Sequence, residues 1–540
     1  MNSFVKENTM GAGTAFTENG AASYATIGTA LLDQFAKSGT ARGRDMDTVW
    51  VEQSKLWAEN PEAALKFPFY LRMITRQTQY NGEKTEKVQK GQGARDEAFK
   101  RMLWIAKFHP EEFYRNLWLV PVVGSWRDLW VLLTMDSSLD KKAFFGVIAE
   151  GIKNESTRDL VKKYLPRIRS DKQCTTDWAK KTNKLAKELA NAAGWTYQQY
   201  RTFKSTGKAH EFQRIICGGL YDHIKWNTIP GKALLNLVSG KFLENHNLTD
   251  KYVAWLGTQP VAKFNGYAYE LGMKLGQSYL KPSLAQKVTI DKQFNNLVAT
   301  ASKDDGAIKG NVLCAIDTSG SMASPVNRSL TLTSYDVCVS LGIYFSALNK
   351  GSFHNVVAMF DDESSLLELK GESFTDKWFQ IRNESTAWGS TNFQSLINLI
   401  CDTRKKNPSI PLEDYPETLL VVSDMQFNPS GSWSSNGASD KENKTNYQAA
   451  MEKLGKYFPK EFVDNFKIIW WYCAGRPTKD FPSTMDDKKT YMFSGFDGSV
   501  ISLLLGGEVI VDEKTGERVE PTMEDIVRAA LNQEVLALVQ

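Results

Sequence analysis

The sequence has few cysteines and no closely spaced pair of them. Its six cysteines are scattered over 540 residues without a C-x-x-C pair, so reduced thiols in a cytosol are expected and a disulfide framework is not. Uninterrupted apolar runs of membrane-spanning length are also absent, and residues 1–23 contain no apolar stretch of signal-peptide length. These absences predict a cytoplasmic protein without a membrane partner, and they argue against an extracellular role.

Several catalytic motifs are absent as well. The chain contains no G-x-x-x-x-G-K-S/T phosphate loop, no G-x-S-x-G nucleophile elbow and no H-E-x-x-H metal motif. Its five histidines are far apart in sequence, which favours ordinary polar or packing roles for them. The sequence therefore predicts a binding protein and not an enzyme.

Length and composition indicate a folded protein of more than one domain. Charged residues make up 24% of the chain and hydrophobic residues 42%, which is typical of globular proteins. A chain of 540 residues is too long for one hydrophobic core, so two or three domains are expected. The formal net charge is only +4, so any strong electrostatic preference depends on how the charges are distributed.

The pattern of apolar residues changes near residue 305. Before it, apolar side chains recur at helical spacing, for example at Ala94, Ala98, Met102 and Ile105, and no strong strand pattern occurs. Short helices joined by proline and glycine turns predict an all-helical, HEAT-like solenoid or ring. After residue 305, short apolar runs alternate with helical patterns, which predicts an α/β domain. The predicted fold class is therefore α plus α/β.

Four apolar runs in the C-terminal half predict strands, at residues 312–316, 356–360, 419–423 and 467–473. Runs of this kind are buried on both faces of a sheet, so we expect a doubly wound, mostly parallel sheet. The predicted division of the chain is a tail at residues 1–23, a helical domain at 24–304 and the α/β domain at 305–540.

The segment 311–322 is the most informative part of the α/β half. Its apolar run is followed by Asp317, Ser319 and Ser321, and open α/β sheets bind ligands at the carboxyl ends of their strands. One carboxylate and two hydroxyls at alternate positions can surround a hard cation that keeps water in its remaining positions. This stoichiometry predicts a site for Mg²⁺ or another divalent cation. The alternative is a serine-rich turn that merely follows a strand.

Two later segments can supply further oxygen atoms. Thr391 precedes the helical pattern of residues 392–400, which places a hydroxyl at the entrance of a helix. Asp424 follows the apolar run 419–423, so it lies at the end of another predicted strand. Three segments in this order make a metal site a better explanation than an isolated turn.

This order of residues resembles the metal-ion-dependent adhesion site of von Willebrand factor A domains, and the resemblance covers roughly residues 305–540. It implies that the direct or water-mediated metal ligands are Asp317, Ser319, Ser321, Thr391 and Asp424. It also implies a free coordination position for a partner's carboxylate or other oxygen, hence binding without turnover. The sequence departs from the commoner pattern at Asn392 and Met425, where many relatives carry aspartate and glycine.

A helical half followed by a von Willebrand A module resembles the Ro autoantigen family, whose helical half is the TROVE module. The local matches are T-E-N-G-A at 17–21, H-P-E-E-F at 109–113, G-S-W-R-D-L-W at 124–130, W-N-T-I-P at 226–230 and G-F-D-G at 495–498. They are closest to an uncharacterised family with the layout of Ro proteins. Ro proteins bind small structured RNAs on a basic surface of a helical ring and admit single-stranded ends into its hole. The resemblance therefore implies a ribonucleoprotein component that binds small structured or misfolded non-coding RNA.

Basic residues are concentrated in one tract of the helical half. Residues 152–214 contain 15 lysine and arginine residues and six acidic residues, a net charge of +9, whereas the whole chain has +4. Segregated positive charge is typical of a phosphate-binding surface, and Trp178 and Tyr200 lie among the charges where they can stack on unpaired bases. The predicted RNA-binding residues are Lys162, Lys163, Arg167, Arg169, Lys172, Lys180, Lys181, Lys184, Arg201, Lys204 and Lys208. The alternative is a solvated helix face with its aromatic residues in the core.

A function of another class also agrees with the sequence. The chain can instead be a protein-interaction adaptor, in which a carboxylate of a protein partner completes the coordination of the metal ion. The family resemblance suggests a MoxR-type AAA+ ATPase as one such partner. A nuclease using the same ion is disfavoured, because two-metal sites usually need more carboxylates than the two present here. The sequence leaves the oligomeric state open.

Overall fold

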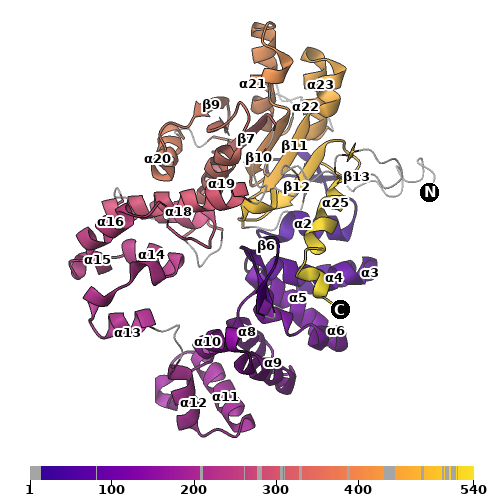
Figure 1. Cartoon of the computed structure of the whole chain (residues 1–540). Helices are drawn as coiled ribbons and strands as arrows, with labels where there is room; N and C mark the ends of the chain where they lie inside the picture. Colours follow the sequence, from indigo (N-terminus) through magenta and orange to yellow (C-terminus); the bar gives the residue numbers. More distant parts are fainter. Residues whose placement is uncertain are drawn as a thin grey trace. The chain divides into compact units, whose positions relative to one another are not determined.

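The structure is a computed structural model of the chain, and it describes residues 14–540 except 81, 207–210, 261, 277–281, 304–307, 309, 327–330, 386–388, 431–443, 476–479, 502–503, 505–509, 512–517 and 520. The chain divides into two compact units. The sheet unit comprises Met1–Asp45 and Gly231–Ala530, and the helical unit comprises Met46–Pro230 and Leu531–Gln540. Figure 1 shows the elements of both. Among the described residues, no helix is both long enough and apolar enough to span a membrane.

The helical unit consists mainly of helices joined by short turns. Its helices are α3 (Met46–Glu59), α4 (Pro61–Arg72), α5 (Arg95–Phe108), α6 (Pro110–Arg115), α7 (Leu119–Val123), α8 (Trp126–Met135), α9 (Lys141–Lys153), α10 (Glu155–Tyr164), α11 (Asp177–Ala192), α12 (Tyr197–Ser205) and α13 (Glu211–Cys217). Consecutive helices pack against each other, as α3 does with α4, α4 with α5, and α9 with α10. This confirms the predicted helical texture of the N-terminal half.

The prediction that this half is all-helical was wrong in one respect. Two antiparallel ribbons interrupt the helices: β3 (Ile74–Arg76) pairs with β6 (Gln89–Gln92), and β4 (Gln79–Tyr80) pairs with β5 (Glu83–Lys84). These strands are two to four residues long and rich in Gln, Lys and Thr. Because they lack alternating apolar residues, the sequence pattern gives no signal for them.

A capping box fixes the start of α8, the helix that carries Arg127. The Asp128 carboxylate accepts hydrogen bonds from the backbone N–H of Ser125 (2.9 Å) and from its hydroxyl (3.1 Å). Arg72 of α4 donates to the same carboxylate, with its NH2 group at 2.6 Å. Both charged groups of this ion pair are largely buried, so α4 and α8 are held in one arrangement within the helical unit.

The sheet unit contains the remaining elements. Its strands are β1 (Thr14–Phe16), β2 (Ala22–Tyr24), β7 (Val312–Asp317), β8 (Val356–Phe360), β9 (Ser364–Glu368), β10 (Thr418–Ser423), β11 (Lys467–Tyr472), β12 (Thr490–Ser494), β13 (Ile510–Val511) and β14 (Arg518–Val519). Its helices are α2 (Ala30–Ser38), α14 (Gly231–Val238), α15 (Phe242–Asn245), α16 (Thr249–Gly257), α17 (Ala268–Gly276), α18 (Leu284–Lys303), α19 (Ser334–Leu348), α20 (Phe374–Glu384), α21 (Phe393–Lys406), α22 (Asn446–Tyr457), α23 (Lys460–Asn465) and α25 (Met523–Leu531).

A six-stranded sheet with the order β12-β11-β10-β7-β8-β9 forms the centre of this unit. All neighbouring strands pair in parallel except β9, which runs antiparallel to β8 at the edge. The four predicted strands are confirmed as β7, β8, β10 and β11, whereas β9 and β12 were missed. After β7 the chain first adds strands on one side of it and then returns to the other side with β10. The junction of β7 and β10 is therefore a topological switch point, where open α/β sheets bind ligands.

Helices before residue 305 also belong to the sheet unit. Helix α17 packs against α19, and a Cβ on Gly272 would lie 2.1 Å from the Ser340 hydroxyl. Helix α18 contributes Asp291, whose carboxylate accepts hydrogen bonds from the backbone N–H (2.9 Å) and hydroxyl (2.7 Å) of Thr375. Because these helices pack on the sheet helices, the division between the compact units does not coincide with the predicted domain boundary at residues 304 and 305.

Residues 14–23, predicted as part of a terminal tail, contribute to a hairpin in the sheet unit. Strands β1 and β2 pair antiparallel, and Tyr24 exchanges two backbone hydrogen bonds with Phe481 (2.9 and 2.8 Å). At the turn of the hairpin, the Thr17 hydroxyl donates to the carbonyl of Phe427 (2.7 Å). The hairpin therefore contacts the segment that follows β10, close to the carboxyl edge of the sheet.

Candidate functional site

Two buried strands end side by side at the carboxyl edge of the sheet. Asp317 is the last residue of β7, and its side chain is fully buried. Its Oδ1 accepts a hydrogen bond from the backbone N–H of Ser319 (2.9 Å), and its Oδ2 accepts one from the hydroxyl of Ser423 (2.5 Å). Because Ser423 is the last residue of β10, this contact joins the two strand ends at the switch point.

Three hydroxyl groups gather beside Asp317. The Oγ of Ser319 lies 3.1 Å from the Oγ of Ser321, and it accepts a hydrogen bond from the Oγ1 of Thr391 at 3.0 Å. Ser319 and Thr391 are buried, whereas Ser321 is exposed on the 3-10 turn η5 (Gly320–Ala323). The structure therefore brings these three predicted ligands together, although 72 positions separate Ser319 from Thr391.

Further contacts hold the loop of Thr391 in place. The backbone N–H of Gly320 donates to the carbonyl of Gly389 (3.0 Å). Asp362, in the turn after β8, accepts hydrogen bonds from the backbone N–H and the hydroxyl of Ser390, and these bonds lower the pKa of the Asp362 carboxyl. A Cβ on Gly389 would lie 2.3 Å from the Asp362 carboxylate, so the close approach of the two loops requires glycine.

Asp424, the fifth predicted ligand, directly follows β10. Its Oδ1 accepts a hydrogen bond from the backbone N–H of Gln426 (3.1 Å), and 8% of its surface is exposed. The intervening residue, Met425, has a φ of 60°. This left-handed conformation costs a residue other than glycine roughly 1–2 kcal/mol. The strain agrees with the sequence resemblance, which places glycine at this position in many relatives.

Electrostatic repulsion acts among the carboxylates of this edge. Burial, followed by the charge of Asp424, raises the pKa of Asp317 to about 7. Asp480, which was not predicted as part of the site, lies close enough to respond to Asp424 as well. Burial raises the pKa of Asp480 to about 6, and the charges of Glu18 and Asp424 act in the same direction. A bound cation would relieve this repulsion.

The oxygen atoms at this edge fit a hard divalent cation. Mg²⁺ binds oxygen at about 2.1 Å in octahedral geometry, so neighbouring ligand oxygens lie about 3.0 Å apart. The Oγ of Ser319 has two hydroxyl oxygens at this spacing, those of Ser321 and Thr391. Within the described part of the chain, no group of three or more His, Cys, Asp or Glu side chains is arranged to hold a metal ion. An ion here would therefore depend on hydroxyl groups and water beside the carboxylates.

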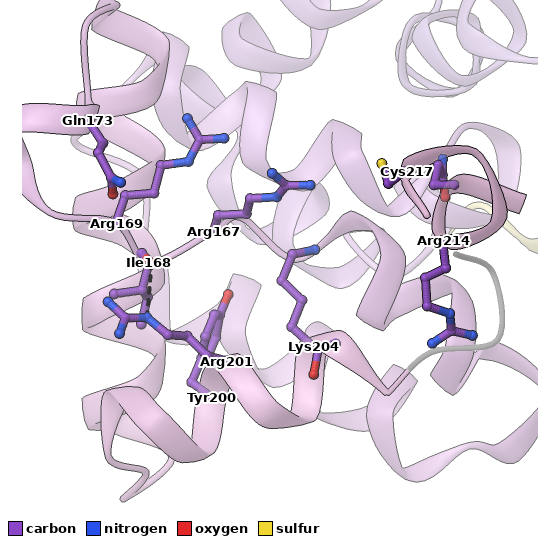
Figure 2. A pocket seen from close by; sticks show the side chains of 11 residues that line it. Arg167, Ile168, Arg169, Gln173, Tyr200, Arg201, Lys204, Arg214 and Cys217 are labelled. Atoms are coloured by element: carbon purple, nitrogen blue, oxygen red, sulfur yellow. Dashed lines mark hydrogen bonds between the residues drawn. The ribbon is translucent and has the colours of Figure 1, made fainter. Parts of the chain in front are cut away.

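A second candidate site lies in the helical unit, within the predicted basic tract. A pocket of about 740 Å³ is lined by five cationic side chains and, among the described residues, by no acidic one. Arg167 and Arg169 follow α10, Arg201 and Lys204 lie on α12, and Arg214 lies on α13. Figure 2 shows Arg167 and Lys204 extending into the same space, with Arg214 across it.

Backbone carbonyl groups hold two of these cations. The Nζ of Lys204 donates to the carbonyls of Lys162 (3.1 Å) and Lys163 (3.2 Å) at the C-terminal end of α10, where the helix dipole favours positive charge. The Nε of Arg201 donates to the carbonyl of Ile168 (3.1 Å). Burial, followed by the charge of Arg167, lowers the pKa of Lys204 to about 8. The lowered pKa reflects mainly the burial of Lys204, and its repulsion by Arg167 adds to it.

A smaller pocket of about 320 Å³ shares Arg167, Arg169 and Lys204 with the first one. Its lining adds Arg127, Lys163 and Trp178. The guanidinium carbon of Arg127 lies 5.4 Å from the centroid of the Trp178 ring, and 38% of Trp178 is exposed. We call the two pockets together the cationic groove. Its cations are Arg127, Lys163, Arg167, Arg169, Arg201, Lys204 and Arg214.

The other predicted RNA-binding residues lie elsewhere in the tract. Lys162, Lys172, Lys180, Lys181 and Lys184 line neither pocket, and Lys208 lies outside the described residues. Tyr200 was predicted to stack on bases, but it is fully buried and its hydroxyl donates to the carbonyl of Pro166 (2.9 Å). It therefore supports the segment that carries Arg167 and Arg169. It also lines the larger pocket, but its ring has no exposed face on which a base could stack.

Sequence reasoning missed Arg127 and Asp480. Arg127 lies outside the charged tract, although it belongs to one of the matched motifs, and only the packing of α8 brings it to Trp178. Asp480 lies beyond the end of the predicted strand 467–473 and outside every matched motif. The Ser423 contact could have been found, because parallel pairing of Val422 with Ile316 places the next residues of both strands side by side.

Part of the chain matches a protein family whose function is undefined. Residues 311–536 match a family described as Domain of unknown function (DUF7788), and this segment contains the central sheet and the five predicted metal ligands. The chain is also similar to Uncharacterized protein L728 of Acanthamoeba polyphaga mimivirus. The two are 22% identical over 537 residues, which cover 92% of this chain and 85% of the viral protein. The similarity thus extends over both compact units.

Proposed function

We propose that this protein binds RNA and that the cationic groove of the helical unit is the contact surface. The observation that carries the proposal is the charge of the groove: seven cations line two pockets that share three of them, and no described lining residue is acidic. Gathering like charges around shared pockets costs free energy, which a polyanion relieves. A nucleic acid backbone is a polyanion of regular spacing.

The exposed ring of Trp178 favours RNA with unpaired bases, and not a regular duplex, as the ligand. Its ring is 38% exposed beside Arg127 and lines the smaller pocket. Unpaired bases stack on exposed aromatic rings, whereas the bases of a duplex are already stacked on one another. The resemblance to Ro proteins points the same way, to small structured or misfolded non-coding RNA with a single-stranded segment.

Paired charge reversals test this proposal. Arg167→Glu/Arg169→Glu removes two groove cations, and Lys142→Glu/Lys153→Glu makes the same change in charge on exposed residues of α9 outside the groove. Measured by fluorescence anisotropy on a short unpaired RNA, the groove variant should lose roughly a hundredfold or more in affinity, since each lost bond to a phosphate is worth about 1.5–3 kcal/mol. The control should lose under about fivefold, because its lysines line neither pocket and salt weakens the remaining long-range attraction. Equal losses would contradict the proposal.

For the sheet unit, we propose a divalent cation, Mg²⁺ by preference, held through a von Willebrand A type arrangement. Asp317, Ser319, Ser321, Thr391 and Asp424 would hold it directly or through water, and the spacing of about 3.0 Å among the hydroxyl oxygens supports this. When bound, the cation supplies a Lewis acid that attracts an oxygen of a partner. The chain's own part is to fix the Asp317 carboxylate through Ser319 and Ser423.

This site also supports the adaptor alternative, in which a protein partner donates a carboxylate. The exposed Ser321 hydroxyl shows that the hydroxyl cluster reaches the surface. Mg²⁺-dependent binding of a MoxR-type ATPase, lost in Ser319→Ala, would favour the adaptor if the same variant kept full RNA affinity. An unchanged interaction in Ser319→Ala would remove the metal site from consideration as the docking point.

A further inference from the structure

The larger pocket of the cationic groove carries more positive charge than an internal stretch of RNA can match. Its five cations, Arg167, Arg169, Arg201, Lys204 and Arg214, surround one space of about 740 Å³. Each internal phosphodiester carries a single negative charge, and successive phosphates are spread along the strand. A pocket of this kind therefore suits a group that concentrates several negative charges at one point.

Two of the five cationic side chains are held in place by backbone carbonyls before an anion binds. The Lys204 amino group is anchored by the carbonyls of Lys162 and Lys163, and Arg201 is anchored by the carbonyl of Ile168. The ion pairs found in this tract among the described residues involve Lys153, Lys162, Lys187 and Glu188, none of which lines the pocket. Arginine side chains bind phosphate oxygens through paired N–H groups. Little side-chain freedom is lost when an anion binds to cations that are already anchored.

We propose that this pocket binds the terminal phosphate group of an RNA chain, a monophosphate or more strongly a triphosphate, and this inference rests on the proposed RNA-binding function. A phosphate monoester carries about 1.5–2 negative charges at pH 7, and a triphosphate carries more. Figure 2 shows Arg167 and Lys204 reaching into the space that such a group would occupy.

The shared lining of the two pockets gives the bound strand a direction. The terminal phosphate occupies the larger pocket, and Arg167, Arg169 and Lys204, which line both pockets, contact the linkage that follows it. The first bases then reach the smaller pocket, where Trp178 offers a half-exposed ring next to Arg127. A free nucleoside triphosphate presents the same terminal chemistry, but it has no following nucleotides to fill the smaller pocket.

The test compares one unpaired RNA sequence in three forms that carry a 5′-hydroxyl, a 5′-monophosphate or a 5′-triphosphate. The label is placed at the 3′ end, and affinity is measured by anisotropy on the full chain at constant salt. The triphosphate form should bind roughly tenfold to a hundredfold more tightly than the hydroxyl form, with the monophosphate between them, because the end group adds charge-assisted hydrogen bonds. Arg167→Gln, an exposed position, should remove most of this preference. Lys142→Gln, at an exposed position of α9 that lines neither pocket, should keep it.

The outcomes separate this inference from the proposed function. Equal and tight binding of all three RNAs would overturn the terminal-phosphate assignment and leave RNA binding intact. Failure of all three to bind would overturn both. Competition with free ATP and with inorganic triphosphate distinguishes the source of the ligand. If either competitor displaces the labelled triphosphate RNA at the same concentration as the unlabelled RNA does, the pocket takes free polyphosphate. The assignment to an RNA end would then be wrong.

Discussion

The substitution Asp317→Asn should have opposite effects on the stability of the protein and on its response to Mg²⁺. Asparagine has the shape of aspartate, so its Oδ1 can still accept the hydrogen bond from Ser319, and its Nδ2 can donate to the hydroxyl of Ser423. The substitution removes the negative charge of a fully buried side chain. We therefore expect the sheet to persist and the metal site to be lost.

The magnitude follows from the pKa of Asp317. Burial and Asp424 raise this pKa from 3.8 to about 7, so the folded protein holds the proton where the unfolded chain has lost it. The raised pKa costs no stability below about pH 4. The cost grows between about pH 4 and pH 7 and reaches on the order of 4 kcal/mol above pH 7. Asparagine does not titrate, so Asp317→Asn removes this cost. In the absence of metal, the variant should therefore gain free energy of unfolding over the same pH range, reduced by about 1 kcal/mol for altered hydrogen bonds.

Urea unfolding in EDTA and in excess Mg²⁺ measures both effects. Wild-type protein should gain about 2.7 kcal/mol when Mg²⁺ is present at about a hundred times its Kd, and Asp317→Asn should gain nothing. Asp336→Asn is a matched control, because Asp336 is also buried with a raised pKa but belongs to the capping box of α19 and is not a predicted ligand, so this variant should keep the Mg²⁺ response. A wild-type-like Mg²⁺ response in Asp317→Asn, or an effect of that substitution that does not vary with pH, would refute the reasoning.

Two further predictions concern each site separately. The Asp317 carboxyl has a pKa of about 7, so its proton competes with the metal ion near neutral pH. Titration calorimetry should therefore find weaker Mg²⁺ binding at pH 6 than at pH 8, with proton release on binding. Equal affinities at the two pH values would speak against Asp317 as a ligand. Trp178→Ala should weaken binding of unpaired RNA by about 1–3 kcal/mol, and Trp178→Phe by much less. The far-ultraviolet circular dichroism of both variants should match that of wild type. Equal losses in both variants would show that the ring is not a stacking surface.

The strands that form the metal edge could be predicted from sequence because they combine two local signals. The strands β7 and β10 are fully buried. Residues 312–316 and 419–422 within them are apolar, and a polar residue follows each of these runs. The edge strand β9 contains only half-buried and exposed positions, and it carries no such run. The ribbons β3 to β6 are shorter still. Their pairing depends on neighbours in space, which a local pattern does not record.

The organisation of the chain was harder to predict than its elements. Helices α14 to α18 have the same amphipathic character as those of the helical unit, and periodicity does not say which surface a helix will cover. Their place in the sheet unit depends on tertiary contacts such as Asp291 with Thr375. The same limit applies to the basic tract. The excess charge was visible in the sequence, but the pocket that concentrates Arg167, Arg201 and Arg214 arises from the packing of three separate segments.

Crosslinking of the native protein to RNA tests the central claim most directly. Protein purified from its own cells after ultraviolet irradiation, and without nuclease, would be digested and searched by mass spectrometry for peptides that carry a nucleotide. The account predicts small RNAs attached to peptides that line the cationic groove, above all those containing Trp178 and Tyr164. RNA attached only to peptides of the sheet unit, or no attached RNA at all, would contradict it.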